Sequence, residues 1–158
     1  MCLKQLVLAT LSTVALTLAV PAGATGIGDE GCTPGYWKNH TDSWIEDASG
    51  LPSYFPTEEF GNVFSVSYGD VTLLEALQGG GGPGISGAKQ ILARAAVAAL
   101  LNAAHDELSY PLRRYQDTPS GPAIIPAVQD VWDSGDRAAI LELATFFDGL
   151  NNLGCPLN

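Results

Sequence analysis

Side chains capable of ligand chemistry are concentrated in one block of the sequence, residues 32–44. On a helix, Tyr36 and His40 are four residues apart and are expected to stack, while Trp37 and Trp44, seven apart, face the same way. Exposed in a hollow, these four rings would form a platform that binds a sugar or another small ligand. Packed beside a cystine, they would instead anchor a helix to the core, and we favour this second interpretation.

The two cysteines that flank the folded region predict a disulfide. Cys2 precedes an apolar leader and is expected to leave with it, so that Cys32 and Cys155 remain near the two ends of the mature chain. An even number of cysteines in a secreted chain favours pairing, and chain ends often lie close together. The alternative, in which each cysteine pairs with another chain, stays open.

The composition offers little to a metal ion. His40 and His105 are the only histidines, and a zinc site needs three or four ligands at suitable spacing. Asp130, Asp133 and Asp136 surround one turn and could hold calcium, but the EF-hand spacing with its closing glutamate is absent. Helix capping by Asp136 is the simpler interpretation. No metal or other cofactor is therefore expected.

A serine nucleophile is conceivable at Ser86. The stretch 84–88 approaches the turn that carries the nucleophile in α/β-hydrolases, but it lacks the final glycine and no strand precedes it. A serine hydrolase that uses Ser86 with His40 or His105 is therefore the weakest of the function hypotheses. Capping of a helix by Ser86 explains the residue more simply.

The first residues have the layout of a secretory signal peptide. Lys4 precedes an uncharged apolar run over residues 6–20, and small residues lead to a predicted cleavage after Ala24. We therefore expect a signal peptide over 1–24, a flexible leader over 25–31 and a single domain over 32–158. The mature protein is expected to be secreted, to the medium or the cell surface, with no membrane span.

The charge of the chain excludes several partners. The formal net charge is −10, and loss of Lys4 with the leader leaves six basic residues against 17 acidic ones. Such a surface disfavours nucleic acid and anionic membranes. It is compatible with cationic partners, and an extracellular glycan or protein is the partner we expect. The oligomeric state is not specified by the sequence.

Hydrophobic periodicity predicts an all-α fold, a small orthogonal bundle of four or five helices wrapped by a segment rich in Gly, Pro and aromatic residues. The strongest element covers residues 88–105, which are alanine-rich and apolar on nearly every side, as in a central buried helix. Residues 63–68 alternate as in a short strand. The remaining helices are expected over 34–40, 73–78, 126–132 and 137–150.

Three segments resemble a broad group of uncharacterised, secreted, mainly bacterial proteins. They are the opening Gly31-Cys32-Thr33-Pro34-Gly35-Tyr36-Trp37-Lys38-Asn39-His40, the stretch Thr72-Leu73-Leu74-Glu75-Ala76-Leu77 with the glycine and alanine runs after it, and the ending Asn151-Asn152-Leu153-Gly154-Cys155-Pro156-Leu157. The resemblance implies an exported domain without an assigned activity or catalytic residues. Some members carry a sorting tail, whereas this chain ends at Asn158, which implies release from the cell.

These observations together predict a non-catalytic extracellular module with a structural or interaction-mediating role. The alternative is a carbohydrate- or small-ligand-binding module that uses Tyr36, Trp37, His40 and Trp44. The two hypotheses differ in the exposure of the rings, because a binding platform requires at least two of them to be exposed in a concave site.

Overall fold

The computed structural model of the protein describes residues 28–45 and 53–157, so the predicted signal peptide over 1–24 lies outside the described residues. Within those ranges the chain forms six α-helices, one 3-10 helix and isolated bridges only, which confirms the all-α fold. Short helices raise the number of α-helices above the predicted four or five. The elements are α1 (Pro34–Asn39), η1 (Thr41–Ile45), α2 (Phe60–Phe64), α3 (Leu73–Gln78), α4 (Gly84–Ala104), α5 (Ile124–Trp132) and α6 (Arg137–Asn151).

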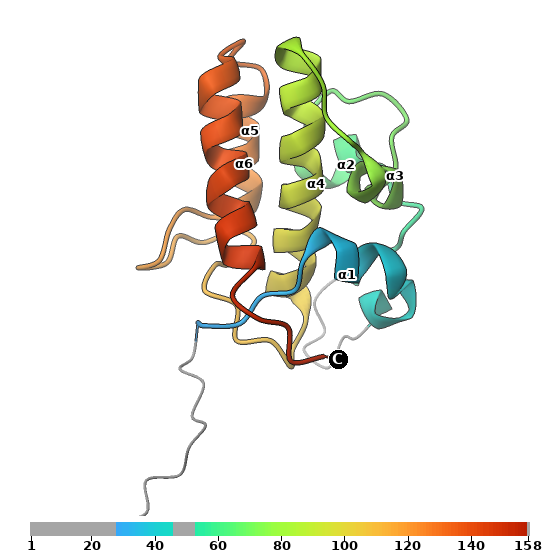
Figure 1. The fold of residues 1–158 in the computed structure, drawn as a ribbon, viewed down its shortest axis with the longest axis vertical. Coiled ribbons are helices and arrows are strands. Elements are labelled where there is room, and N and C mark those ends of the chain that lie inside the picture. The colour runs from blue at the N-terminus through green and yellow to red at the C-terminus, as the bar shows by residue number, and fades with distance from the viewer. Residues whose placement is uncertain (1–27, 46–52, 158) are drawn as a thin grey trace, which may run out of the picture.

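Three helices form the body of the bundle. In Figure 1, α4 and α6 run side by side in the same direction, and α5 lies behind α6 and runs in the opposite direction. Arg137 Nε at the start of α6 donates to the carbonyl of Gly84 at the start of α4. The short helix α1 lies across the lower part of α4, and α3 packs against α4 on the same side.

The central helix α4 is buried as predicted. Its apolar positions are enclosed along most of its length, and many of them are alanine, which lets the neighbouring helices approach closely. By length and composition α4 could cross a membrane, but most of its apolar window is buried inside the protein. Its apolar character is therefore explained by the core that α3, α5 and α6 complete around it.

Several predicted helix starts are confirmed. Thr33 caps α1 by accepting from the backbone N–H of Tyr36, and Thr72 forms a capping box with Glu75 at the start of α3. Asp136 accepts from the backbone N–H groups of Ala138 and Ala139 in the first turn of α6. The prediction for Ser86 was wrong, because α4 begins earlier, at Gly84, and Ser86 lies exposed in its first turn.

The strand predicted over residues 63–68 does not form. Helix α2 ends at Phe64, and Ser65 takes a left-handed conformation that terminates it. Phe60 and Phe64 lie four residues apart, and their rings stack with centroids 4.3 Å apart inside the core. Helical spacing buries both rings at once, and this packing overrides the weak two-residue alternation of the sequence.

A disulfide between Cys32 and Cys155 joins the two ends of the described fold, as predicted. Beside it, Gly31 and Gly154 pair in an antiparallel bridge, with Gly31 N donating to Gly154 O at 2.9 Å. A side chain at position 31 would overlap the carbonyl of Leu150, so a glycine is required for this close approach.

Candidate functional site

The aromatic block is divided between the core and the surface. Trp37 is 0% exposed and Trp44 is 4% exposed. The indole N–H of Trp44 donates to the carbonyl of Trp37 at 3.0 Å, so that η1 is held against α1. Neither indole is open to a ligand, and this burial supports the packing interpretation of the two tryptophans.

Tyr36 and His40 occupy the outer side of α1. Their rings stack with centroids 4.2 Å apart, as the spacing predicts. The Tyr36 hydroxyl donates to the carbonyl of Leu157 at 3.2 Å, and His40 Nδ1 lies 2.9 Å from the carbonyl of Tyr36. Only these two of the four candidate ligand-binding residues reach the surface, and Tyr36 uses its hydroxyl to hold the C-terminal segment.

A buried polar network in the core is centred on Asn102. The sequence alone did not identify this residue as a candidate site residue. Its side chain is 0% exposed. Its Oδ1 accepts from the Cys32 backbone N–H at 2.8 Å and from the Trp37 indole at 2.9 Å. Its Nδ2 donates to Cys32 O at 2.9 Å and to Asn151 Oδ1 at 3.0 Å. All four hydrogen-bonding positions of the amide are therefore used.

Asn151 extends this network into α6. Its Oδ1 also accepts from the hydroxyl of Tyr110 at 2.9 Å, and its Nδ2 donates to the carbonyl of Ala95 at 3.0 Å. Burial raises the pKa of Tyr110 well above its ordinary value, because the phenolate would lose its hydration. The network joins the disulfide segment, α4, α6 and the connector after α4, which makes it structural.

A second buried phenol lies against an arginine. Arg114 Nη1 donates to the hydroxyl of Tyr54 at 3.3 Å, and the guanidinium carbon lies 5.6 Å from the centre of the same ring. Burial raises the pKa of Tyr54 to about 12, although the hydrogen bond from Arg114 opposes this shift. Tyr54 is consequently a neutral packing group at physiological pH.

The residues of the hydrolase hypothesis are not brought together. Ser86 lies in the first turn of α4 and His105 is its C-cap, so the helical rise separates them by about 28 Å. A chain of ring contacts through Tyr36 and Trp37 places His40 at the same end of α4 as His105. Ser86 is therefore out of hydrogen-bond reach of either imidazole, and the catalytic arrangement that this hypothesis requires does not form among these residues.

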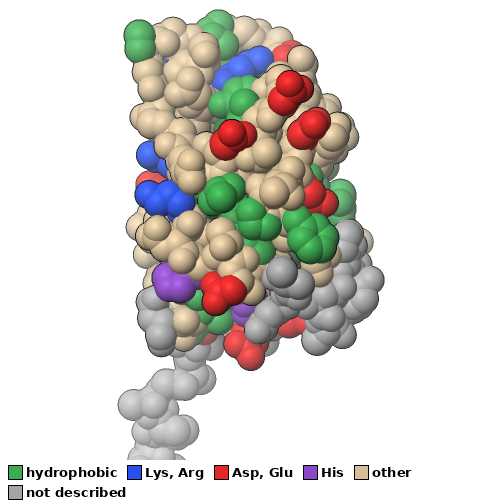
Figure 2. Space-filling model, turned by 90° about the vertical axis from the view of Figure 1, so that its right-hand side faces the viewer, with side chains coloured by type: hydrophobic (Ala, Val, Ile, Leu, Met, Phe, Trp, Pro, Cys, Tyr) green, Lys and Arg blue, Asp and Glu red, His purple; other side chains and the backbone are tan. Residues whose placement is uncertain are grey.

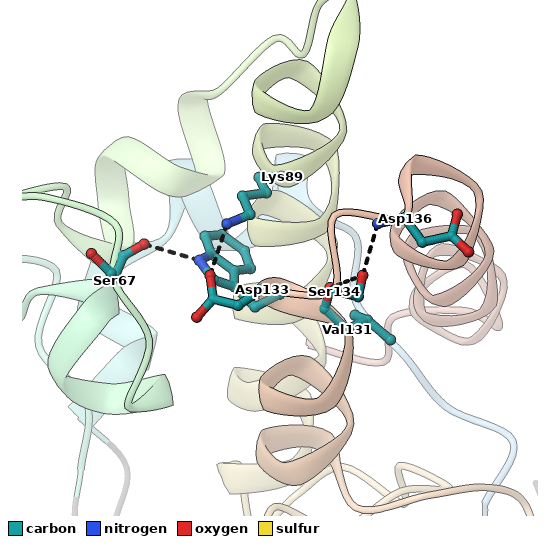
Figure 3. Close-up of polar contacts among 7 residues, drawn as sticks. Ser67, Lys89, Val131, Asp133, Ser134 and Asp136 are labelled. Atoms are coloured by element: carbon teal, nitrogen blue, oxygen red, sulfur yellow. Dashed lines mark hydrogen bonds and ion pairs between the residues drawn. The ribbon is translucent and has the colours of Figure 1, made fainter.

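Two of the three aspartates around the α5–α6 turn have separate structural roles. Asp136 caps α6, and Asp133 Oδ1 lies 3.1 Å from Lys89 Nζ. Figure 3 shows this pair beside Ser67, whose carbonyl accepts from the indole of Trp132 at 3.0 Å. Across the residues that the structure describes, no group of three or more His, Cys, Asp or Glu side chains could hold a metal ion.

Figure 2 shows the face that α1, α2 and α3 form. Acidic side chains are spread over this face from top to bottom, hydrophobic ones gather across its middle, and basic ones lie at the top and the left edge. Several hollows of about 410 to 420 Å³ lie on the described surface, and two of them are of interest for ligand binding. The first, of about 420 Å³, lies where α1, the end of α3, α4 and α6 meet, and Lys38, Arg94 and Asp148 line it. We call it the polar groove.

The second hollow, also of about 420 Å³, lies between α5, α6 and the loop before α5. Val131, Leu143 and Phe146 line it, and we call it the apolar groove. The ring of Phe146 lies directly against Gly121, where a Cβ atom would meet it at 2.6 Å. An adjoining hollow of similar size shares Val131 and Leu143 with it.

Comparison of the chain with models of protein families, with curated proteins and with solved structures finds no match.

Proposed function

We propose that this protein is an exported, non-catalytic module that binds a partner protein through the apolar groove. One observation carries the proposal: apolar side chains of α5 and α6 are only half-buried there, whereas the tryptophans are enclosed in the core. Exposed apolar hollows rimmed by polar groups are typical of protein interaction sites.

The rim of the groove specifies the chemistry of the partner. Glu142 lines the apolar groove, and Asp117 and Asp130 line the adjoining hollow. Of the described residues that line these two hollows, none is basic. The partner that fits is therefore a peptide segment with an apolar side chain flanked by lysine or arginine, because its cations would lie over the three carboxylates.

Export is the second part of the proposal. It rests on the leader predicted over residues 1–24 and on the Cys32–Cys155 disulfide, since disulfides persist in oxidising compartments. Intact-mass measurement of protein recovered from the culture medium tests it. We expect a chain that begins at Thr25 and that gains the mass of two hydrogens on reduction. A chain that keeps its leader, or that already carries two thiols, would contradict this part.

The docking surface is tested with short peptides. We expect acetyl-Lys-Leu-Leu-Lys-amide to shift the amide NMR signals of residues around Val131 and Leu143. The peptide with glutamate in place of lysine, and the one with serine in place of leucine, are expected to leave them unchanged. Equal shifts with all three peptides, or none with the first, would overturn the proposal.

Two neighbouring substitutions on α6 provide a matched pair. Ala139 lines the groove and Ala138, the preceding residue, is exposed outside it. Ala139→Lys fills the groove and repels a basic segment, so we expect it to abolish the shifts. Ala138→Lys adds the same charge to the same helix and is expected to preserve them.

A further inference from the structure

The basic residues of the described chain divide into two groups. Four of the six have a hydrogen bond or ion pair within the protein: Lys89, Arg113, Arg114 and Arg137. Lys38 and Arg94 have neither with any described residue. These two residues come from different helices, α1 and α4, and both line the polar groove.

The presence of Lys38 and Arg94 in one groove affects the electrostatic potential there. The chain carries a formal charge of −10, and most of its cations are engaged with protein groups. Two cations without partners that face one hollow produce a local positive potential on an otherwise acidic surface. Such a hollow concentrates anions, and an arginine fork beside a lysine is suited to a carboxylate.

The other lining residues restrict the ligand further. Gln78 and Asn152 offer side-chain amides, and Asp148 places a single carboxylate at the same groove. A carboxylate opposite two cations disfavours a dianion and accepts hydrogen bonds from hydroxyl groups. The volume of about 420 Å³ is suited to a ligand of about one sugar ring.

We propose that the polar groove binds a small monocarboxylate that also carries hydroxyl groups, such as a hexuronate. The carboxylate of the ligand contacts Lys38 and Arg94. Its hydroxyl groups contact Asp148 and the two amides. This site is separate from the apolar groove, and binding at either one does not require the other.

The position of α1 makes the site depend on the buried network. Lys38 follows Trp37, whose indole is fixed by Asn102, and Cys32 at the start of this segment is held by the disulfide. Lys38 and Arg94 therefore line a groove whose two walls, α1 and α4, are held together. This preorganisation reduces the entropy that a ligand loses on binding.

Isothermal titration calorimetry of the mature, oxidised protein at low salt tests the proposal with four probes: sodium glucuronate, glucose, glycine and inorganic phosphate. We expect glucuronate to bind, glucose to fail for lack of the carboxylate, and glycine and phosphate to bind more weakly. Absence of glucuronate binding, equal binding of glucose, or tighter binding of phosphate or glycine would each overturn it.

Charge-neutral variants locate the site. Arg94→Gln and Lys38→Gln are each expected to weaken glucuronate binding about tenfold, as loss of a charge-assisted hydrogen bond implies. Arg137→Gln is the control, because it removes the same charge from an exposed residue outside the groove. Equal weakening by all three variants would show attraction by net charge alone and would contradict a defined site. Thermal unfolding of each variant verifies that it folds.

Discussion

Asn102 and Asn151 meet inside the protein, where Asn102 Nδ2 donates to Asn151 Oδ1 at 3.0 Å, and both side chains are 0% exposed. Through this contact the segment that contains Cys32 is joined to α4 and α6 independently of the disulfide. A fully satisfied polar network in an apolar core fixes one arrangement of the elements that it connects, because any other arrangement leaves buried donors unpaired.

Replacement of Asn102 by alanine is expected to lower the free energy of unfolding by about 3 kcal/mol, since the Cys32 N–H and the Trp37 indole lose their acceptor inside the core. Urea denaturation followed by tryptophan fluorescence measures the loss. Asn39→Ala is the control, because Asn39 is exposed and bonds only within α1, to Gly35 O. A similar change for both variants would contradict the central role of Asn102.

An isosteric variant separates hydrogen bonding from packing. Asn102→Asp keeps the shape of the side chain but replaces the donor Nδ2 with an acceptor oxygen. Cys32 O and Asn151 Oδ1, which accept hydrogen bonds from Nδ2 in the wild type, would then face another acceptor. We expect this variant to be as unstable as the alanine variant at neutral pH. Wild-type stability in Asn102→Asp would mean that volume, and not hydrogen bonding, is what position 102 supplies.

Reduction of the disulfide is expected to destabilise the protein by about 4 to 5 kcal/mol, the value for a closed loop of this length in the chain-entropy model. The sequence separation of the two cysteines is 123 residues. Denaturation midpoints of the oxidised protein, the reduced protein and the Cys32→Ala/Cys155→Ala variant provide the comparison. The last two should agree, and equal stability of all three forms would remove the disulfide from the account of stability.

Two buried phenols predict alkaline unfolding. Burial raises the pKa of Tyr54 from 10.0 to about 12, and it raises the pKa of Tyr110 further. A tyrosine whose pKa is higher in the folded state than in the unfolded state contributes its full stabilisation below pH 10. This contribution is lost as the pH rises through the folded-state pKa. Circular dichroism should therefore report unfolding above pH 10, together with tyrosinate absorbance. Tyr54→Phe should keep more of its stability than wild type over this range.

Two glycines inside helices should respond in opposite ways to alanine. At Gly87 in α4 a Cβ would overlap the backbone of Gly82, so Gly87→Ala must displace the glycine-rich loop and lower stability. At Gly149 in α6 a Cβ meets nothing, and Gly149→Ala should raise the free energy of unfolding by up to about 1 kcal/mol. Melting temperatures of the two variants check both signs, and a stabilised Gly87→Ala would contradict the close contact.

The elements with local signals were predictable from sequence. Thr33 with Pro34 and the Thr72–Glu75 capping box each act within one helical turn, so the residues that decide the structure are neighbours in the chain. The disulfide followed from the two cysteines that remain after the predicted leader and from the tendency of chain ends to lie close together. The strand expected over 63–68 was wrong because stacking of Phe60 on Phe64 depends on the whole core.

No local sequence signal predicted the two grooves or the hydrogen-bond network of Asn102 and Asn151. Asn102 and Asn151 are 49 residues apart in the sequence, and Asn102 looked only like a polar exception on an apolar helix. The sequence did offer one indication, because a side-chain amide buried on such a helix needs hydrogen-bond partners from elsewhere in the chain. Lys38 and Arg94 could not be related to each other without the packing of α1 on α4.

The covalent closure at Cys32 and Cys155 also determines how the protein carries mechanical load. Their Cα atoms are 4.5 Å apart, and every helix from α1 to α6 lies between them in the chain. Tension applied to the two extremities passes directly across the sulfur atoms, so the helices remain unloaded. Single-molecule pulling of the oxidised form should extend only the outer segments, and reductant should release the full contour length of the enclosed chain.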